Sequence, residues 1–462
     1  MVSSFESAIP TDAAKSIQLH TCHLQYVYWV TGMTYDPLEL EKDKSTTIPF
    51  IVRSNVEKQG YMSFVLPLLY NSTFSLVIDA DDLLALPSSD WMDGALSAIQ
   101  THPSVVPVCG LYPNSQVGRG CMLMRSIDLR YIWSMTTFRR KSMRAMEAFS
   151  HVLRCKFDFA LTDSILPSPR LVKTAFTPST FVKENCEQVY EVEDFKCDAH
   201  YRNDHTTGVV ISQYKRPYLT KQLQALQQSD ANVTETIVVQ GGHKINLESV
   251  LKSWPSVRHV WMTNWDSPFF RFLLSFELSA YYIHHLNDDI MLGRTTLTAL
   301  NRVASKYNAP VTTDGRLVTQ LDYREGLFKQ KCLSPQKGYA AEADFIIGLF
   351  GGRMGSMKVF WRYRPLTQRN GEDIHFSMAN NVECGVKSRV LGVSKESDRI
   401  KDLGNDGNGA SLKSDHFRIR GQLLRNWVLQ GAHLIQKRFP SFPSGYRKIH
   451  SVSMHYFRCC VS

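Results

Sequence analysis

Short apolar runs alternate with segments of helical periodicity through the second half of the chain. The apolar runs lie at residues 208–212, 236–239, 257–262 and 281–286. Leu219, Leu223 and Leu226 recur at the spacing of one helix face, and residues 269–278 have the pattern of a further helix. Strands that alternate with helices over short links form a parallel sheet with right-handed crossovers. The pattern therefore predicts an α/β fold.

The first half repeats parts of this pattern in the same order. At offsets of 207 to 210 residues, the matches join 26–32 to 236–242, 51–55 to 260–264 and 74–82 to 281–289. Several ordered matches predict a tandem duplication. The first copy has no match for residues 208–217 or for the pair Glu372 and Asp373. We therefore expect it to be incomplete and inactive, with an N-terminal segment lost.

These observations divide the chain into four parts. We expect an incomplete copy at 1–185, a polar linker at 186–206, a complete domain at 207–410 and a basic extension at 411–462. The extension holds nine basic residues and one acid, in a chain of formal charge +10. Such a segment is typical of contact with nucleic acid or with an anionic membrane surface. No nucleic-acid module precedes it, so we expect no specific nucleic-acid partner.

Composition narrows the class of protein further. Hydrophobic residues make up 43% of the chain, which excludes a mainly disordered protein. The sequence contains neither a signal peptide nor an uncharged apolar run of about eighteen residues that would cross a membrane. Its ten cysteines include no CxxC pair, which argues against a zinc ribbon or a thioredoxin-like redox site. Sequons at Asn71 and Asn232 would accept glycans in a secretory compartment.

Two acidic motifs carry candidate chemistry, and the first is the pair Asp288 and Asp289. These residues follow an apolar strand, at the sheet edge where open α/β folds bind ligands. Carboxylates are the ligands that Mg²⁺ and Mn²⁺ prefer, and such a metal usually shares its shell with substrate phosphates. The alternative is a solvated acidic turn. The recurrence of the motif at Asp79, Asp81 and Asp82 favours the metal–diphosphate interpretation.

The second motif is the pair Glu372 and Asp373, which follows a predicted strand at 343–348 and an aromatic stretch at 360–363. One carboxylate would act as general base toward an acceptor hydroxyl or would bind the acceptor. The alternative is that both acids simply stabilise the positive end of a helix. Trp361, in the aromatic stretch, would contact an acceptor sugar, although core packing is the commoner role of tryptophan.

Together these motifs resemble a GT-A glycosyltransferase of the family 2-like or exostosin C-terminal (family 64-like) type. The resemblance covers about residues 207–395, in the family's order. It is carried by residues 211–217, 287–289, 343–348 and 372–373. It implies a UDP- or GDP-sugar donor, Mn²⁺ or Mg²⁺, and transfer of a hexosyl or N-acetylhexosaminyl group to a hydroxyl of a glycan or glycoprotein acceptor. It also implies the lumen of the ER or Golgi, reached through an upstream anchor.

The resemblance also implies roles for single residues. Asp289 would bind the metal, Asp288 would bind ribose or the metal, and Asn287 takes the first position of the DxD motif. Because Asn287 replaces an aspartate, two carboxylates remain, and we expect weaker metal binding rather than none. The other residues would be Gln213, Tyr214 and Arg216 in the nucleotide pocket, Arg271 on a phosphate, and Asp373 with Glu372 on the catalytic or acceptor side.

Two other classes of function remain open. The first is a catalytically inactive GT-A-like protein that binds glycan or nucleotide, or that serves as a scaffold for a partner enzyme. Asn287 and the degenerate first copy favour it, whereas the intact pair Glu372 and Asp373 argues against it. The second is a nucleic-acid-binding protein that acts through the basic extension. His284 and His285 lie within a predicted strand, so we expect them to be structural rather than metal ligands.

Overall fold

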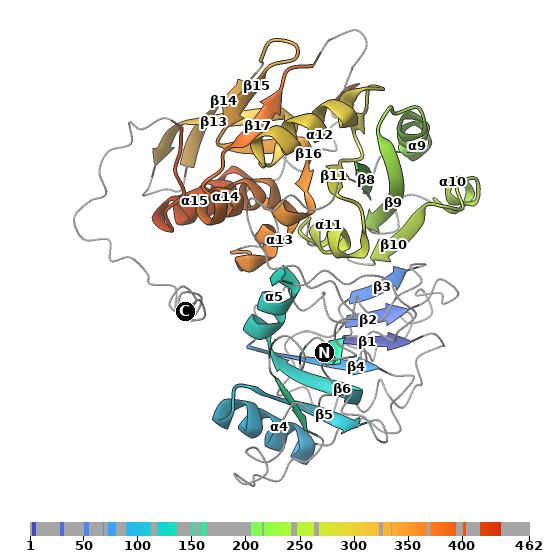
Figure 1. Ribbon diagram of the computed structural model, residues 1–462, viewed down its shortest axis with the longest axis vertical. Helices are drawn as coiled ribbons and strands as arrows, with labels where there is room; N and C mark the ends of the chain where they lie inside the picture. The colour runs from blue at the N-terminus through green and yellow to red at the C-terminus, as the bar shows by residue number, and fades with distance from the viewer. Residues whose placement is uncertain are drawn as a thin grey trace, which may run out of the picture.

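The protein is described by a computed structural model (Figure 1). The described residues are 2–5, 28–31, 50–54, 68, 73–79, 89–111, 118–135, 149–150, 153, 157, 159–162, 205–214, 217–241, 247–262, 268–322, 327–333, 335–366, 370–393, 401–402 and 416–435. Among them, sixteen strands form one mixed sheet that runs through both halves of the chain. The predicted α/β class is confirmed, with a central, mostly parallel sheet.

Four parallel strands form the centre of the second half, in the order β10-β9-β8-β11. They are β8 (Thr206–Gln213), β9 (Asn232–Gly241), β10 (Arg258–Met262) and β11 (Tyr282–Leu286). Each contains one of the predicted apolar runs or most of it. The links contain α9 (Leu219–Gln227), α10 (Glu248–Lys252), and α11 (Phe270–Leu273) with the short 3₁₀ helix η3 (Leu274–Glu277).

The sheet of the second half becomes mixed beyond β11. Its further strands are β13 (Val311–Asp322), β14 (Leu327–Leu333), β15 (Ala340–Ala343), β16 (Phe345–Arg353) and β17 (Ser388–Leu391). β16 runs antiparallel to both β11 and β13, and β17 runs parallel to β13. The helices are α12 (Thr296–Tyr307), α13 (Met354–Arg362), α14 (Glu372–Cys384) and α15 (His416–Leu429). A small separate sheet pairs β12 (Ile290–Met291) with β18 (Lys401–Asp402).

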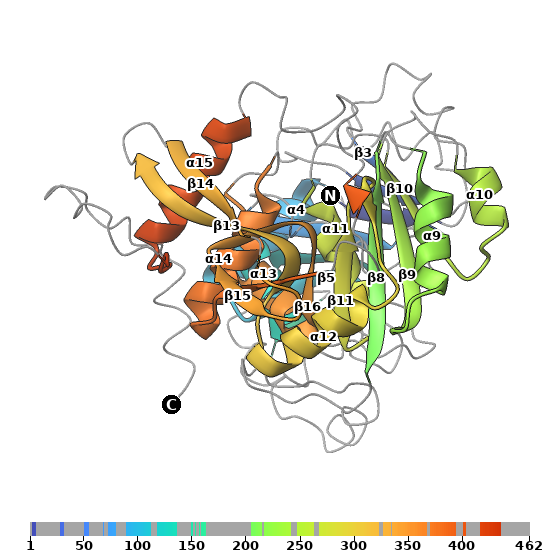
Figure 2. The ribbon, with the colours of Figure 1, turned by 90° about the horizontal axis from the view of Figure 1, so that it is seen from above.

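Helices cover both faces of this sheet (Figure 2). Successive residues of a strand point to opposite faces, and β8 is apolar on both. Val209 and Ile211 belong to one core with residues of α9 and α12, whereas Val210 belongs to another with residues of α11, α13 and α14. The parallel strands are therefore packed against helices on both faces.

The first half has the same strand order as the second. It consists of β1 (Val2–Phe5), β2 (Tyr28–Thr31), β3 (Phe50–Ser54), β4 (Phe74–Asp79), α4 (Ser89–Thr101), β5 (Val105–Leu111), β6 (Gly118–Arg125), α5 (Ser126–Met135) and β7 (Ala160–Thr162). The order β3-β2-β1-β4-β6-β5-β7 corresponds to β10-β9-β8-β11-β16-β13-β17, with the same strand directions throughout.

One expectation about the first half was wrong. The sequence pattern gave no counterpart of residues 208–217, yet β1 lies between β2 and β4, parallel to both, as β8 lies between β9 and β11. The reason is that β1 is short and has Ser3 and Ser4 at its centre, so it contains no apolar run. The expected counterparts of the acidic motif are only partly described: Asp79 ends β4, and Asp81 and Asp82 lie outside the described residues.

The two halves meet through β3 and β10, which hold the same position in the two strand orders (Figure 1). They pair antiparallel, with Val260 opposite Ser54 and Trp261 opposite Arg53. This is the arrangement that a local two-fold axis produces. One hydrophobic core contains residues of both halves, and the rings of Trp133 and Phe276 lie 5.3 Å apart across the junction.

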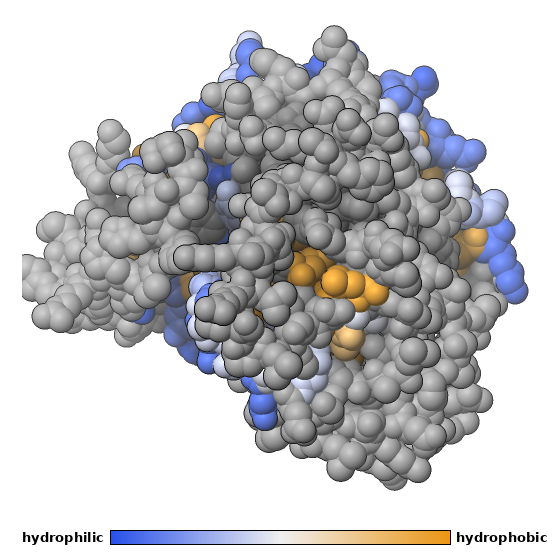
Figure 3. Space-filling model, turned by 60° about the horizontal axis from the view of Figure 1, so that its bottom comes forward, coloured by the Kyte–Doolittle hydropathy of each residue, from blue (hydrophilic) through white to orange (hydrophobic). Residues whose placement is uncertain are grey.

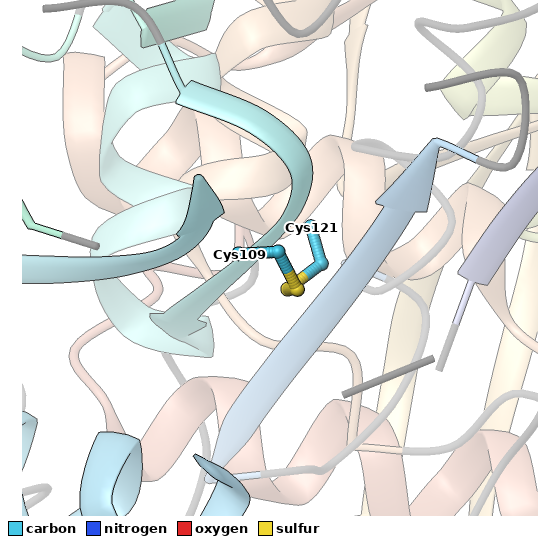
Figure 4. Close-up of a disulfide and its surroundings, with 2 residues drawn as sticks. All are labelled: Cys109 and Cys121. Carbon is cyan, nitrogen blue, oxygen red and sulfur yellow. A yellow bond between two sulfur atoms is a disulfide. The ribbon is translucent and has the colours of Figure 1, made fainter. Parts of the chain in front are cut away.

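A disulfide joins Cys109 of β5 to Cys121 of β6 (Figure 4). This bond was not predicted from sequence, because the two residues match no spacing motif. Cys332 of β14 is an exposed free thiol.

Few large apolar side chains are exposed among the described residues. Figure 3 shows a group of hydrophobic residues on the face that it turns forward, with hydrophilic ones toward the edges. The exposed large hydrophobic residues are Ile127, Tyr339, Leu366 and Phe417, which lie in four different segments. Within the same part of the chain, no helix has the length and apolar character needed to cross a bilayer.

Candidate functional site

The acidic motif Asn287–Asp289 lies where the sequence placed it, directly after β11. Leu286 ends that strand and pairs with Ile211 of its parallel neighbour β8, so both strands end at the same edge of the sheet. Tyr214 follows β8, and its backbone N–H donates to Asp288 Oδ2 at 3.3 Å. The structure thus brings together Tyr214 and Asp288, two residues predicted to contact the donor.

Gln222 of α9, whose role was not predicted from sequence, orders the turn after β11. Its Nε2 donates to the carbonyl oxygens of Asn287, at 2.8 Å, and Ile290, at 2.9 Å. Its Oε1 accepts from Nε2 of the buried Gln213, which ends β8. The sequence signal that could have identified Gln222 is its position among the leucines of an apolar helix face. Gln213 therefore has a role in building the turn, and Arg216 lies outside the described residues.

Arg271 joins the two acidic motifs. Its side chain is buried in α11, with Nη1 donating to Asn287 Oδ1 at 2.5 Å and Nη2 donating to Glu372 Oε1 in an ion pair. The guanidinium carbon also lies 4.5 Å from the centre of the Phe350 ring, within the range of a cation–π contact. The start of α14 therefore lies beside the end of β11, although the two are far apart in sequence.

Glu372 is the more accessible carboxylate of the second motif. Its side chain is 12% exposed, and Oε1 is held by Arg271. Burial raises the pKa of Glu372; the Arg271 guanidinium opposes this shift, and the neighbouring Asp373 adds to it. A carboxyl group with a raised pKa is better suited to accept a proton near neutral pH than an ordinary one.

Asp373 is engaged by α15. Its two carboxylate oxygens accept from Nη1 and Nη2 of Arg420, each at 2.9 Å, and Oδ1 also accepts from the Ile374 backbone N–H at 2.8 Å. Both side chains are buried. Arg420 was missed because its segment was assigned to the basic extension, and only the packing of α15 on α14 reveals its partner.

The junction before α14 depends on Gly371. This residue has φ +88°, in the left-handed region, and an added Cβ would lie 2.6 Å from Leu423 Cδ2 of α15. Glycine therefore allows α15 to approach the start of α14 closely. The glycine that precedes the acidic pair thus has a structural reason to be there.

Other residues predicted from sequence have structural roles. Trp361 is fully buried, and its Nε1 donates to the Phe272 carbonyl at 3.3 Å, so the expectation that it contacts an acceptor was wrong. His284 and His285 are buried, as expected for structural residues. His284 Nε2 lies 2.7 Å from Asn301 Oδ1. Burial lowers the pKa of His284 to about 4.

A divalent metal would be held by Asp288 and Asp289. Among the described residues, no group of three or more His, Cys, Asp or Glu side chains is arranged to hold a metal alone. Two adjacent carboxylates at a sheet edge nevertheless fit the way in which Mg²⁺ binds, through one or two carboxylates with substrate phosphates and water completing the shell. Asn287 Oδ1 accepts from Arg271, and the metal role expected for Asn287 stays a prediction.

Comparison with known proteins gave weak similarities only. No family model matches the chain, and no curated protein matches it. A crystal structure of S. aureus TarS 1-349 is 15% identical, with a TM-score of 0.32, and the match covers 42% of this chain and 59% of that one. Its complex with UDP-GlcNAc gives 15% identity, a TM-score of 0.31, and coverage of 42% and 57%. The chain thus spans less than two thirds of those structures.

Proposed function

We propose that this chain is a metal-dependent glycosyltransferase. It would move a hexosyl or N-acetylhexosaminyl group from a UDP- or GDP-sugar to a hydroxyl of a glycan or glycoprotein. The observation that carries the proposal is the bridge made by Arg271, because it joins Asn287 of the first acidic motif to Glu372 of the second. Both motifs thereby meet at the C-terminal edge of β8 and β11, where open α/β sheets bind ligands.

The donor would lie over the ends of β8 and β11. Tyr214 and Gln213, with Arg216, would line the nucleotide pocket, and Asp288 and Asp289 would hold Mn²⁺ or Mg²⁺. When bound, such a metal neutralises charge on the leaving diphosphate. The protein's own part is to fix the turn after β11, which the hydrogen bonds from Gln222 do.

The acceptor would lie beside the start of α14. In a direct displacement, the acceptor oxygen forms a bond to the anomeric carbon while the bond from that carbon to the diphosphate oxygen breaks. The electron pair of that bond leaves with the diphosphate, and the hydroxyl proton passes to a carboxylate of the pair Glu372 and Asp373. The raised pKa of Glu372 supports this role.

We also propose that the two halves are tandem copies, with the first, 1–185, serving as scaffold or acceptor platform to the domain at 207–410. Their identical strand order and their antiparallel junction support this interpretation. The basic extension at 411–462 would contact an anionic membrane surface through the residues outside α15. The helix α15 itself packs on α14.

The location that we propose is the ER or Golgi lumen. The disulfide between Cys109 and Cys121 supports an oxidising compartment, because such bonds persist there and are rare in the cytosol. Thiol labelling of protein taken directly from cells tests this: Cys109 and Cys121 should resist labelling until a reductant is added, whereas Cys332 should react at once.

An inactive GT-A-like protein is the second candidate. Asn287 in place of an aspartate favours it, and so does the engagement of both Asp373 oxygens by Arg420. The glycosyltransferase and the inactive protein differ in whether they turn over a sugar donor. A transferase should release nucleoside diphosphate from one member of a panel of UDP- and GDP-sugars with Mn²⁺ and glycan acceptors, and Asp289→Ala should abolish the release. Nucleotide binding without turnover of any donor would favour the inactive protein.

A further inference from the structure

The position of Arg271 does not suit the phosphate contact predicted from sequence. The two terminal nitrogens of its guanidinium donate to Asn287 and Glu372, and Nε is buried. The side chain is 4% exposed, and its guanidinium carbon lies 4.5 Å from the centre of the Phe350 ring. Each terminal nitrogen keeps a second N–H, but the burial of the side chain leaves a diphosphate little access to these groups.

We propose that Arg271 is a positioning residue that couples Glu372 to the metal-binding turn. The inference rests on the proposed glycosyltransferase function and deepens it. Because a guanidinium is planar, its two terminal nitrogens fix the directions of both partners at once. Any shift of the turn after β11 is thereby transmitted to Glu372, the first residue of α14. The distance between the turn, which would hold the donor, and the Glu372 carboxylate, on the acceptor side, is held constant.

This arrangement gives a reason for asparagine at position 287. The Asn287 Oδ1 atom accepts from Arg271 and so is turned to the guanidinium rather than to a metal. Because the amide oxygen of Asn287 carries no charge, Glu372 is the only one of the two partners that neutralises the positive charge of Arg271. An aspartate would place two carboxylates on one guanidinium. Asn287 is therefore part of the link, and Asp288 and Asp289 alone would carry the metal.

The same arrangement prepares Glu372 for its role. Arg271 donates to Oε1 of Glu372 and so fixes the orientation of that carboxylate. The charged groups that act on Glu372 are Arg271, Asp373 and Arg420. Of these, Arg420 is committed to Asp373 through two hydrogen bonds, so Arg271 is the residue that orients Glu372.

The first experiment titrates Mn²⁺ and UDP or GDP into the full chain and into Asn287→Asp. If Asn287 belongs to the link, the added carboxylate leaves Mn²⁺ affinity unchanged and lowers the rate of donor turnover. If Asn287 faces the metal instead, the third carboxylate tightens Mn²⁺ binding by about tenfold or more, which would overturn the inference. Absence of Mn²⁺-dependent nucleotide binding in the wild type would overturn the proposed function and this inference with it.

The second experiment compares Arg271→Lys and the double variant Arg271→Met/Glu372→Gln with the wild type. The double variant removes both charges, so neither remains buried alone. A positioning role predicts that both variants bind UDP and UMP with the wild-type ratio of affinities, and that Arg271→Lys, which keeps Glu372, lowers turnover by about 10²-fold through kcat. A selective loss of UDP affinity over UMP in both variants would instead show a phosphate contact and overturn the inference while leaving the proposed function standing.

Discussion

Asp373 and Arg420 form a bidentate ion pair, with both oxygens of Asp373 accepting from Arg420 at 2.9 Å. The pair joins the first turn of α14 to α15, and both side chains are about nine-tenths buried. A buried ion pair adds little net stability, but the loss of one partner leaves a buried charge uncompensated. The pair therefore makes the geometry of the acidic motif dependent on the docking of α15.

The first prediction concerns this pair. Arg420→Gln should lower the free energy of unfolding by about 3–5 kcal/mol, because it strands the Asp373 carboxylate. The double variant Asp373→Asn/Arg420→Gln should recover most of the loss. Urea denaturation of the two single variants and the double variant measures the coupling. Additive effects of the two substitutions would contradict the pairing.

We expect the stability of the protein to be sensitive to substitution of Gly371. Gly371→Ala should destabilise the protein by more than about 1 kcal/mol, because φ is positive and the new Cβ would meet Leu423. Gly385→Ala is the matched control, since Gly385 also has positive φ, +67°, but no atom within 4 Å of the added Cβ. Thermal unfolding should show the larger loss at position 371. Equal losses of stability at both positions would mean that the contact with Leu423 of α15 adds nothing to the cost of the substitution.

Buried histidines should make stability depend on pH. Burial lowers the pKa of His284 to about 4 and that of His375 to about 3, whereas unfolded histidine titrates near its ordinary value of 6.5. The unfolded chain therefore binds more protons between these values. Stability is then full above about pH 6.5 and falls as the pH falls, by up to about 1.4 kcal/mol per pH unit for each residue.

Urea midpoints at pH 7 and pH 5 test this pH dependence. His284→Gln should flatten the curve, whereas His433→Gln, at an exposed position, should leave it unchanged. A wild-type midpoint that does not change between these two pH values would contradict the buried, neutral histidines.

The halves should unfold together. Arg130 of α5, whose pKa burial lowers to about 9, donates to the Leu68 carbonyl at 2.6 Å and to the Trp361 carbonyl of α13 at 3.4 Å. Calorimetry should show one transition, and Arg130→Met should move the whole of it to lower temperature because α5 and α13 share a core. Arg294→Ala, at an exposed surface pair, should change stability by less than about 1 kcal/mol. Two separate transitions would contradict a common core.

The parallel strands of the second half were predictable because each carries an apolar run, and the position of Asp288 and Asp289 follows from them. β1 was not predictable, since Ser3 and Ser4 break the apolar pattern and its place depends on pairing with β2 and β4. Pairing across the sheet is a property of the whole chain, which local sequence does not contain.

The candidate site, like the fold, was predictable from sequence only in part. The residue types of the two acidic motifs were identified from sequence, but the links between them were not. Gln222, Arg271 and Arg420 act through partners 9 to 101 residues away in sequence. Such contacts are set by the packing of α9, α11 and α15, so sequence alone gave Arg271 a different partner and gave Arg420 none.

We propose that the edge formed by β8 and β11 binds a nucleoside diphosphate together with a divalent metal. Calorimetric titration of UDP and GDP, with and without Mn²⁺, tests it on the wild type, Asp289→Ala and the surface control Asp230→Ala. We expect the wild type and the control to bind one of the nucleotides only when Mn²⁺ is present, and Asp289→Ala not to bind it. No binding by any of the three folded proteins, or binding that needs neither Mn²⁺ nor Asp289, would contradict it.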